Sequence, residues 1–104
     1  MEAILSRLGV PLETIRQFCA RWNIVEFALF GSVVREDFRP DSDIDVMVTF
    51  GRGGMSPWPW GTIAMKLELE DLFGREVDVV VRETVNNPFL GQTISKDLTV
   101  VYAA

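Results

Sequence analysis

The stretch of sequence that decides the fold runs from Phe30 to Phe50 and reads FGSVVREDFRPDSDIDVMVTF. The stretch begins at the end of an apolar run and continues with Gly31-Ser32 and a polar segment. In its last part, two sets of residues alternate. The alternating residues are Ile44, Val46 and Val48 on one side and Asp43, Asp45 and Met47 on the other. A period of two is typical of a β-strand with one buried face. The stretch therefore predicts a strand end, a tight turn, a loop and a second strand.

Acidic residues at the start of this second strand predict a metal site. Asp43 and Asp45 leave the same face of a strand, where like charges repel unless a divalent cation lies between them. Asp78 repeats the arrangement on a later strand that could lie beside the first. Three carboxylates from two neighbouring strands suit Mg²⁺ or Mn²⁺, and two such ions can stabilise both oxygens of a phosphoryl displacement. The alternative for an isolated Asp-x-Asp is a pair of solvated side chains.

The Gly31-Ser32 turn favours the metal site over that alternative. Gly31 permits close backbone approach, and Ser32 offers a hydroxyl and an amide before a short helical turn expected over 33–37, where anions bind favourably. Arg35 lies in this turn and could reach a phosphate or hold the following loop. A phosphate-binding turn and metal-binding carboxylates on adjacent elements predict a nucleotide site. An aspartyl-phosphate phosphatase is excluded, because its nucleophile ends a strand after an apolar run, whereas here the acids begin the strand.

The remaining sequence predicts alternating helices and strands. The expected helices cover 11–23, 60–73 and 86–96, and the expected strands cover 24–30, 43–50, 76–81 and 98–102. Pro11 marks the start of the first helix and Gly74 the end of the second. In the first strand we expect Val25, Phe27 and Leu29 to share a face. This order predicts a single α/β domain, residues 1–104, with a mixed sheet of about four strands flanked by helices.

Composition narrows the class of protein. A chain of 104 residues, 48% of them hydrophobic, supports one small core. The net charge of −5 argues against wrapping nucleic acid, but not against nucleotides bridged by a cation. The absence of histidine excludes Ser-His and Cys-His catalysis. Cys19 falls on an apolar helical stripe and is expected to be a core thiol. With no apolar run of about 20 residues and no signal-like start, we expect a cytoplasmic protein.

The run from Gly31 to Val46 resembles the signature of minimal nucleotidyltransferases, the smallest members of the DNA polymerase β-like superfamily. The family pattern is Gly-Ser, then Arg, then Ser-Asp-x-Asp, and later a strand with a third Asp, which 74–80 matches. The resemblance implies the polymerase β-like fold, with Asp43, Asp45 and Asp78 binding two Mg²⁺ ions. Asp78 would also help deprotonate the attacking hydroxyl. Gly31, Ser32 and Arg35 would bind the phosphates of ATP. Glu36 departs from the Gly found in many members.

The resemblance also implies a partner, because members are often antitoxins paired with an all-helical HEPN ribonuclease toxin, and some transfer AMP from ATP to a tyrosine of that toxin. The leading expectation is therefore an adenylyl-transferring antitoxin. The alternative is a binding-only antitoxin that neutralises its partner without catalysis. A transferase for a small molecule is less consistent with the short chain. Met55, Trp58 and Trp60, in or beside a Gly- and Pro-rich loop, are candidates for the partner surface. The alternatives are that both tryptophans fold back onto the core or that they stack on the nucleobase.

Overall fold

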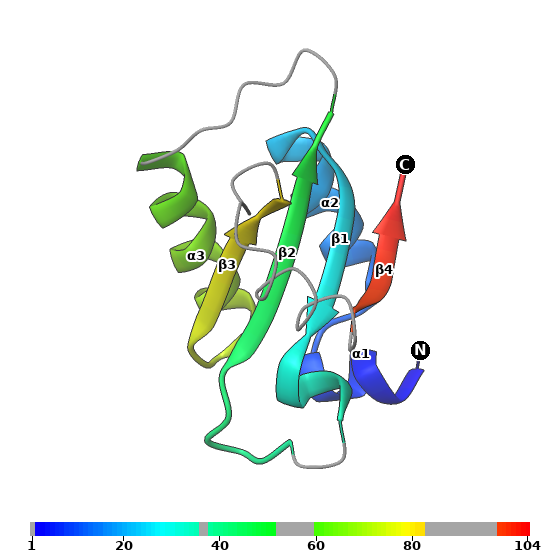
Figure 1. Ribbon diagram of the computed structural model, residues 1–104, viewed down its shortest axis with the longest axis vertical. Helices are drawn as coiled ribbons and strands as arrows, with labels where there is room; N and C mark the ends of the chain where they lie inside the picture. Colours follow the sequence, from blue (N-terminus) through cyan, green and yellow to red (C-terminus); the bar gives the residue numbers. More distant parts are fainter. Residues whose placement is uncertain (1, 36–37, 52–59, 83–97) are drawn as a thin grey trace.

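The computed structural model describes residues 2–35, 38–51, 60–82 and 98–104, which form an α/β fold around one four-stranded sheet (Figure 1). In chain order the elements are α1 (Glu2–Leu8), α2 (Leu12–Trp22), β1 (Ile24–Phe30), the 3-10 turn η1 (Gly31–Val34), β2 (Ile44–Phe50), α3 (Trp60–Phe73), β3 (Val77–Val81) and β4 (Thr99–Ala103). The strand order across the sheet is β3-β2-β1-β4. Helix α2 packs on β1 and β4, and α3 packs on β3.

The sheet is mixed, as the sequence predicts. Strand β1 pairs antiparallel with both β2 and β4, whereas β2 pairs in parallel with β3. One face carries the core, which includes Phe27 and Leu29 of β1 and Val46 and Val48 of β2, all fully buried. Because side chains alternate along a strand, the residues between them point to the opposite face. That opposite face therefore carries Asp45.

The first predicted strand has the expected bounds, and Phe27 and Leu29 share a face as expected, but Val25 does not. Ile24, and not Val25, joins Phe27 and Leu29 in the buried core. The pairing of β1 with β2 shifts register between Ile24 and Glu26. A bulge of this kind adds one residue to one strand and reverses the alternation locally. A strict period of two therefore predicts the wrong buried residue at the start of this strand.

The helices agree with their predicted signals. Pro11 precedes α2, and Asn23 ends it in the left-handed conformation at φ 56°. Cys19 is fully buried in this helix, as expected, and burial raises the pKa of its thiol to about 12. Helix α3 has the predicted bounds of residues 60 and 73, and it stops at Gly74, whose φ of 69° suits a helix end. Helix α1 was not predicted, because its seven residues are too few to show a period.

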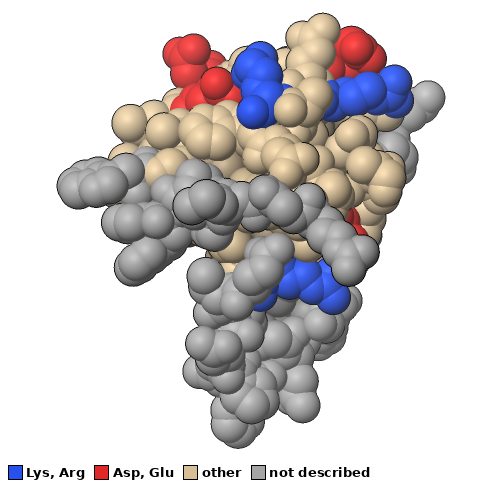
Figure 2. All heavy atoms as spheres, turned by 90° about the horizontal axis from the view of Figure 1, so that it is seen from above, with Lys and Arg blue, Asp and Glu red and all other residues tan. Residues whose placement is uncertain are grey.

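Other predictions are shifted or lie outside the described residues. The turn after β1 covers Gly31–Val34 instead of 33–37, and β2, β3 and β4 each begin one residue later than predicted. The expected helix 86–96, the residues Met55 and Trp58, and the side chain of Trp60 are not among those described. Within the described ranges, no helix is long and apolar enough to cross a bilayer. From above, the described part of the surface shows acidic and basic side chains near one another (Figure 2).

Candidate active site

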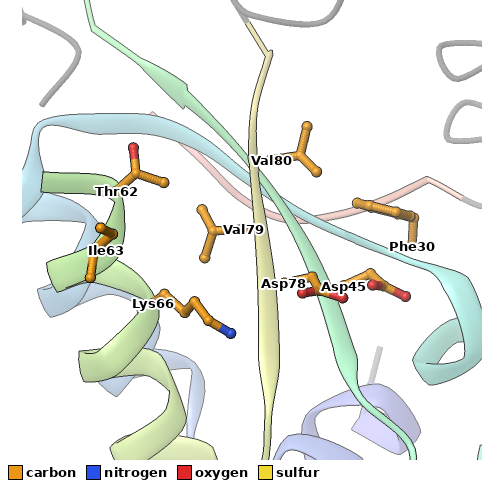
Figure 3. A pocket seen from close by; sticks show the side chains of 8 residues that line it. All are labelled: Phe30, Asp45, Thr62, Ile63, Lys66, Asp78, Val79 and Val80. Atoms are coloured by element: carbon orange, nitrogen blue, oxygen red, sulfur yellow. The ribbon is translucent and has the colours of Figure 1, made fainter. Parts of the chain in front are cut away.

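The site is built around two aspartates on neighbouring strands. Parallel pairing of β2 with β3 places Asp45 directly opposite Asp78, and Figure 3 shows the two side chains next to each other. Asp45 is half-buried, whereas Asp78 is exposed. Each aspartate alternates with apolar residues that face the core, so the fold fixes the direction of both. The sequence prediction that these strands are neighbours is confirmed.

Asp45 stands in an environment that disfavours its charge. Its pKa is raised above the ordinary value of 3.8, first by burial, then by the negative charges of Asp78 and Asp43, while Arg35 acts in the opposite direction. Asp43 and Asp78 therefore both lie close enough to Asp45 to act on its charge. Arg35 lies near the same carboxylate. A cation at this position would relieve the repulsion that raises this pKa.

Gly31 makes room for that carboxylate. The glycine follows Phe30, the partner of Asp45 across the β1–β2 ladder, and its φ is 76°. A Cβ atom added at Gly31 would collide with Oδ2 of Asp45 and lie 3.1 Å from its Cγ. The sequence predicted that a backbone would approach closely at this glycine. In the folded chain, the group that comes close is the Asp45 side chain.

Ser32 lies in η1, next to Gly31. The turn contains only four residues, and the Arg35 amide donates to the Ser32 carbonyl over 3.0 Å. A single 3-10 turn has little helix dipole, so any anion here would depend on the hydroxyl and individual amides of the turn. Ser32 is half-buried and remains at the same end of the sheet as Asp45. Its predicted role as a phosphate ligand stays a prediction.

Asp43 lies immediately before β2 and is exposed. The preceding turn is closed by two hydrogen bonds of 3.0 Å, from the Ser42 amide to the Arg39 carbonyl and from the Arg39 amide to the Ser42 hydroxyl. Among the described residues, no three acidic, histidine or cysteine side chains are grouped closely enough to hold a metal ion by themselves. Mg²⁺ usually takes only one or two carboxylates and completes its shell with water and substrate phosphates. The donor type and the Asp45–Asp78 pair fit such an ion.

A cleft of about 430 Å³ adjoins the two aspartates. Its lining combines Asp45, Asp78 and Lys66 with apolar and small side chains (Figure 3). The remaining lining residues are Phe30, Thr62, Ile63, Val79 and Val80. Lys66 extends from α3 towards Asp78 in this view, and its ammonium donates to the Val77 carbonyl over 2.9 Å and to Glu70 over 3.1 Å. The buried Thr62 hydroxyl has no hydrogen-bond partner among the described residues.

Sequence reasoning missed Lys66. The available signal was its spacing, because Lys66 lies on the same helix as the apolar stripe and four residues before Glu70. Such a pair is common on helix surfaces and carries no sign of a site. Only the parallel pairing of β3, which brings Asp78 beside α3, gives Lys66 its place in the cleft.

The mixed sheet, the paired aspartates and the glycine turn together define a nucleotidyl-transfer domain of the polymerase β-like fold. The sequence matches the family described as Nucleotidyltransferase domain over residues 12–101, so the chain belongs to this family and is a nucleotidyltransferase. The family resemblance inferred from the motifs is confirmed. The match covers both strands that carry the aspartates.

Two relatives support the assignment. A Thermococcus cleftensis protein named protein adenylyltransferase MntA is 29% identical over 101 residues, which cover 97% of this chain and 95% of that protein. A Methanocaldococcus jannaschii protein, named as a candidate protein adenylyltransferase, is 31% identical over 83 residues, or 78% of this chain and 80% of the relative. In both comparisons the matched region covers most of this chain and most of the relative.

Solved structures share the fold. A candidate minimal nucleotidyltransferase is similar with a TM-score of 0.63 at 33% identity, covering 86% of this chain and 95% of that one. A chain of a toxin–antitoxin complex with AMP-PNP has a TM-score of 0.76 at 16% identity, covering 91% and 75%. A chain from the complex of a tri-AMPylated Shewanella oneidensis HEPN toxin with its MNT antitoxin has a TM-score of 0.67 at 16% identity, covering 89% and 70%. The last two, at this identity, show the fold alone.

Proposed function

We propose that this nucleotidyltransferase moves AMP from ATP to a hydroxyl group, and that the Asp45–Asp78 pair, with Asp43 nearby, would hold Mg²⁺ together with water and the ATP phosphates. The observation that carries the proposal is the pairing of Asp45 with Asp78 beside the Gly31 turn. This arrangement gathers negative charge where a metal–nucleotide complex would compensate it. The relatives named for adenylyl transfer, which match most of the chain, support AMP as the transferred group.

Each residue has a distinct role in this proposal. Mg²⁺, when bound, would neutralise phosphate charge and stabilise the attacking and leaving oxygens. Ser32 donates its hydroxyl and amide to the phosphates, and Arg35 adds positive charge beside Asp45. The acceptor oxygen attacks the α-phosphorus, the bond from that phosphorus to the bridging oxygen breaks, and pyrophosphate leaves. Asp78, which is exposed at the edge of the sheet, accepts the hydroxyl proton.

The cleft beside Asp78 supports an acceptor that carries a ring. Phe30, Ile63, Val79 and Val80 give it an apolar lining next to the carboxylate. We assign the acceptor as a tyrosine hydroxyl of a HEPN-type helical protein, which this chain would neutralise as its antitoxin. The likeness of the fold to MNT–HEPN complexes supports such a partner. A tyrosine ring against the apolar lining would place its hydroxyl near Asp78.

The proposal is tested by co-expressing the chain with a HEPN-type partner and purifying the pair through a tag on one. Incubation with ATP and Mg²⁺ should add one or more AMP units to the partner's intact mass, and peptide mass spectrometry should locate them on tyrosine. The addition should disappear with Asp43→Asn and when a chelator replaces Mg²⁺. Replacing the modified tyrosine by phenylalanine should also prevent it.

The same experiment decides between catalysis and binding. Co-purification with no change in mass, together with neutralisation of the toxin by Asp43→Asn, would establish the binding-only antitoxin instead. AMP on serine or threonine would keep adenylyl transfer and reject the tyrosine assignment. Failure to co-purify at all would reject the HEPN partner, and transfer to other acceptors would then be measured by release of pyrophosphate.

A further inference from the structure

Two arginines outside the predicted site hold the loops that carry it. Arg7, on α1, is half-buried and donates from Nη1 to the carbonyls of Val33, over 2.8 Å, and Arg35, over 2.6 Å. These carbonyls end the η1 turn that contains Ser32. The last carbonyls of a helical turn have no partner within the turn, and a cationic donor there satisfies them. Arg7 therefore ties the phosphate-binding turn to the first helix.

Arg75 performs the same function on the loop before β2. It lies between α3 and β3, and its Nη1 donates to the carbonyls of Arg39 and Ser42, each over 3.1 Å. Ser42 directly precedes Asp43, and Arg75 itself lies shortly before Asp78. One guanidinium thus joins the two segments that carry these aspartates.

The ring of Phe38 lies close to both arginines. The centroid of its ring is 4.5 Å from Cζ of Arg75 and 5.7 Å from Cζ of Arg7. Both distances are within the range of about 6 Å over which a cation is attracted to a ring face. These three residues, Arg7, Phe38 and Arg75, are called the arginine clamp below. The clamp joins α1, the loop before β2 and the start of β3.

We propose that Arg7 and Arg75 are positioning residues that fix the Ser32 turn and Asp43 relative to Asp45 through their hydrogen bonds to the loops, and that Phe38 couples the two arginines. Both guanidinium groups bind backbone carbonyls, so they act on the site through the loops and not by touching substrate. The inference rests on the proposed function only in naming the nucleotide and the metal ion as the ligands of these loops. The clamp itself is a property of the folded chain and can be tested without substrate.

The first test measures the loops directly. Amide hydrogen exchange is followed by NMR at Arg35, whose amide bonds to the Ser32 carbonyl, and at Ser42, whose amide bonds to the Arg39 carbonyl. Arg7→Ala should speed exchange about tenfold at the first amide, and Arg75→Ala should do so at the second. Amides within the β1–β2 ladder should not change. Arg16→Ala is the matched control, since Arg16 is an exposed arginine of α2 paired with Glu13.

The second test separates positioning from general stability. If Arg7 fixes the phosphate-binding turn, Arg7→Ala should mainly raise KM for ATP, whereas Arg75→Ala should mainly lower kcat. A displacement of about 1 Å can change a rate by about 100-fold, so effects of 10- to 100-fold are expected. Phe38→Tyr keeps the ring and should retain activity. In a Phe38→Leu background the two arginine effects should become additive, because the coupling through the ring is lost.

The outcomes distinguish this inference from the proposed function. If the parent chain neither binds nor transfers nucleotide, the proposed function fails, and the exchange experiment still decides the clamp. If exchange at Arg35 and Ser42 is the same in Arg7→Ala, Arg75→Ala and Arg16→Ala, the clamp is overturned, whatever the activity. Arg75→Lys, which keeps the charge but not the planar guanidinium, takes the place of Arg75→Ala if the latter does not fold.

Discussion

At the scale of single residues, the site depends on what surrounds Asp45. The carboxylate is half-buried, lies opposite Asp78 in the ladder, and packs against the bare Cα of Gly31. Burial and the opposite Asp78 make the charge of Asp45 unfavourable in the folded chain. The contact with Gly31 fixes the position of the carboxylate. If Asp45 has the role proposed above, stability and function make opposite demands on this residue.

Asp45→Asn should stabilise the chain at neutral pH and abolish metal-dependent transfer. The folded-state pKa of Asp45 lies above its ordinary value of 3.8. The folded state therefore binds more protons than the unfolded state between these two pKa values, and the free energy of unfolding falls as pH rises through that window. The gain from Asn should be small below about pH 4 and complete above the folded-state pKa. Thermal unfolding across this range measures it.

Asp41→Asn is the matched control for that experiment, because Asp41 is an exposed aspartate of the loop before β2 and its replacement changes the net charge equally. A stabilisation by Asp45→Asn that is no larger than the one by Asp41→Asn would show that only the overall charge matters. Equal transfer by Asp45→Asn and the parent would remove Asp45 from the proposed mechanism.

Gly31→Ala should destabilise the chain more than Gly9→Ala. Both glycines have a φ of 76°, where an L-residue costs about 1–2 kcal/mol. A Cβ at Gly9 meets nothing within 4 Å, whereas a Cβ at Gly31 meets the Asp45 carboxylate. The difference between the two variants in denaturant unfolding therefore isolates the collision. Equal losses would mean that Asp45 moves aside at no cost.

At the scale of elements, the junction of α3 with β3 sets the position of Asp78. Glu70, near the end of α3, accepts the Val77 amide over 3.2 Å and the Lys66 ammonium over 3.1 Å. These bonds join the last turns of the helix to the first residue of the strand. The Val77 amide, followed by Lys66, lowers the pKa of the Glu70 carboxyl. Lys66 in turn donates to the Val77 carbonyl, so the two side chains bind both backbone polar groups of this residue.

Glu70→Gln should remove a pH-dependent part of the stability. Because the folded-state pKa of Glu70 is depressed, its contribution is present above the ordinary value of 4.5 and is lost as pH falls through the folded-state pKa. The variant and the parent should therefore differ most at neutral pH and converge in acid. Urea unfolding at several pH values measures this. Glu68→Gln, on the same helix but bonded to Arg21 and Trp22, is the control.

The sequence determined most of these elements for identifiable reasons. Strand β1 was bounded correctly because Asn23 and Gly31 are both suited to a positive φ, at 56° and 76°. The aspartate pair was predictable because the period of two fixes which face each strand residue takes. The bulge near Val25 was not, since it depends on pairing with β2. The arginine clamp could not be predicted either, because contacts among positions 7, 38 and 75 produce no periodic pattern in the sequence.

At the scale of the whole molecule, a net charge of −5 would repel an unaccompanied nucleotide. ATP affinity should therefore depend strongly on Mg²⁺, falling at least tenfold when a chelator removes the ion. Calorimetric titration with and without chelator measures this at constant ionic strength. Equal affinity under both conditions would contradict the metal site.

Replacing Ser32 by alanine tests the proposed phosphate contact. Ser32→Ala should weaken ATP binding only modestly, with little change in the stability of the chain.

The parallel pairing of Asp45 with Asp78 also determines when the site comes into being. Parallel neighbours need a long crossover connection, here the passage through α3. Because β1 and β2 precede β3 in the chain, the ribosome completes both strands, and with them Asp45, before it adds the opposite residue, Asp78. A nascent or truncated chain that ends before β3 has no such site, however well its first half folds. On the proposed function, a chain that ends before β3 therefore has no catalytic capacity, which arises only once the crossover through α3 has formed.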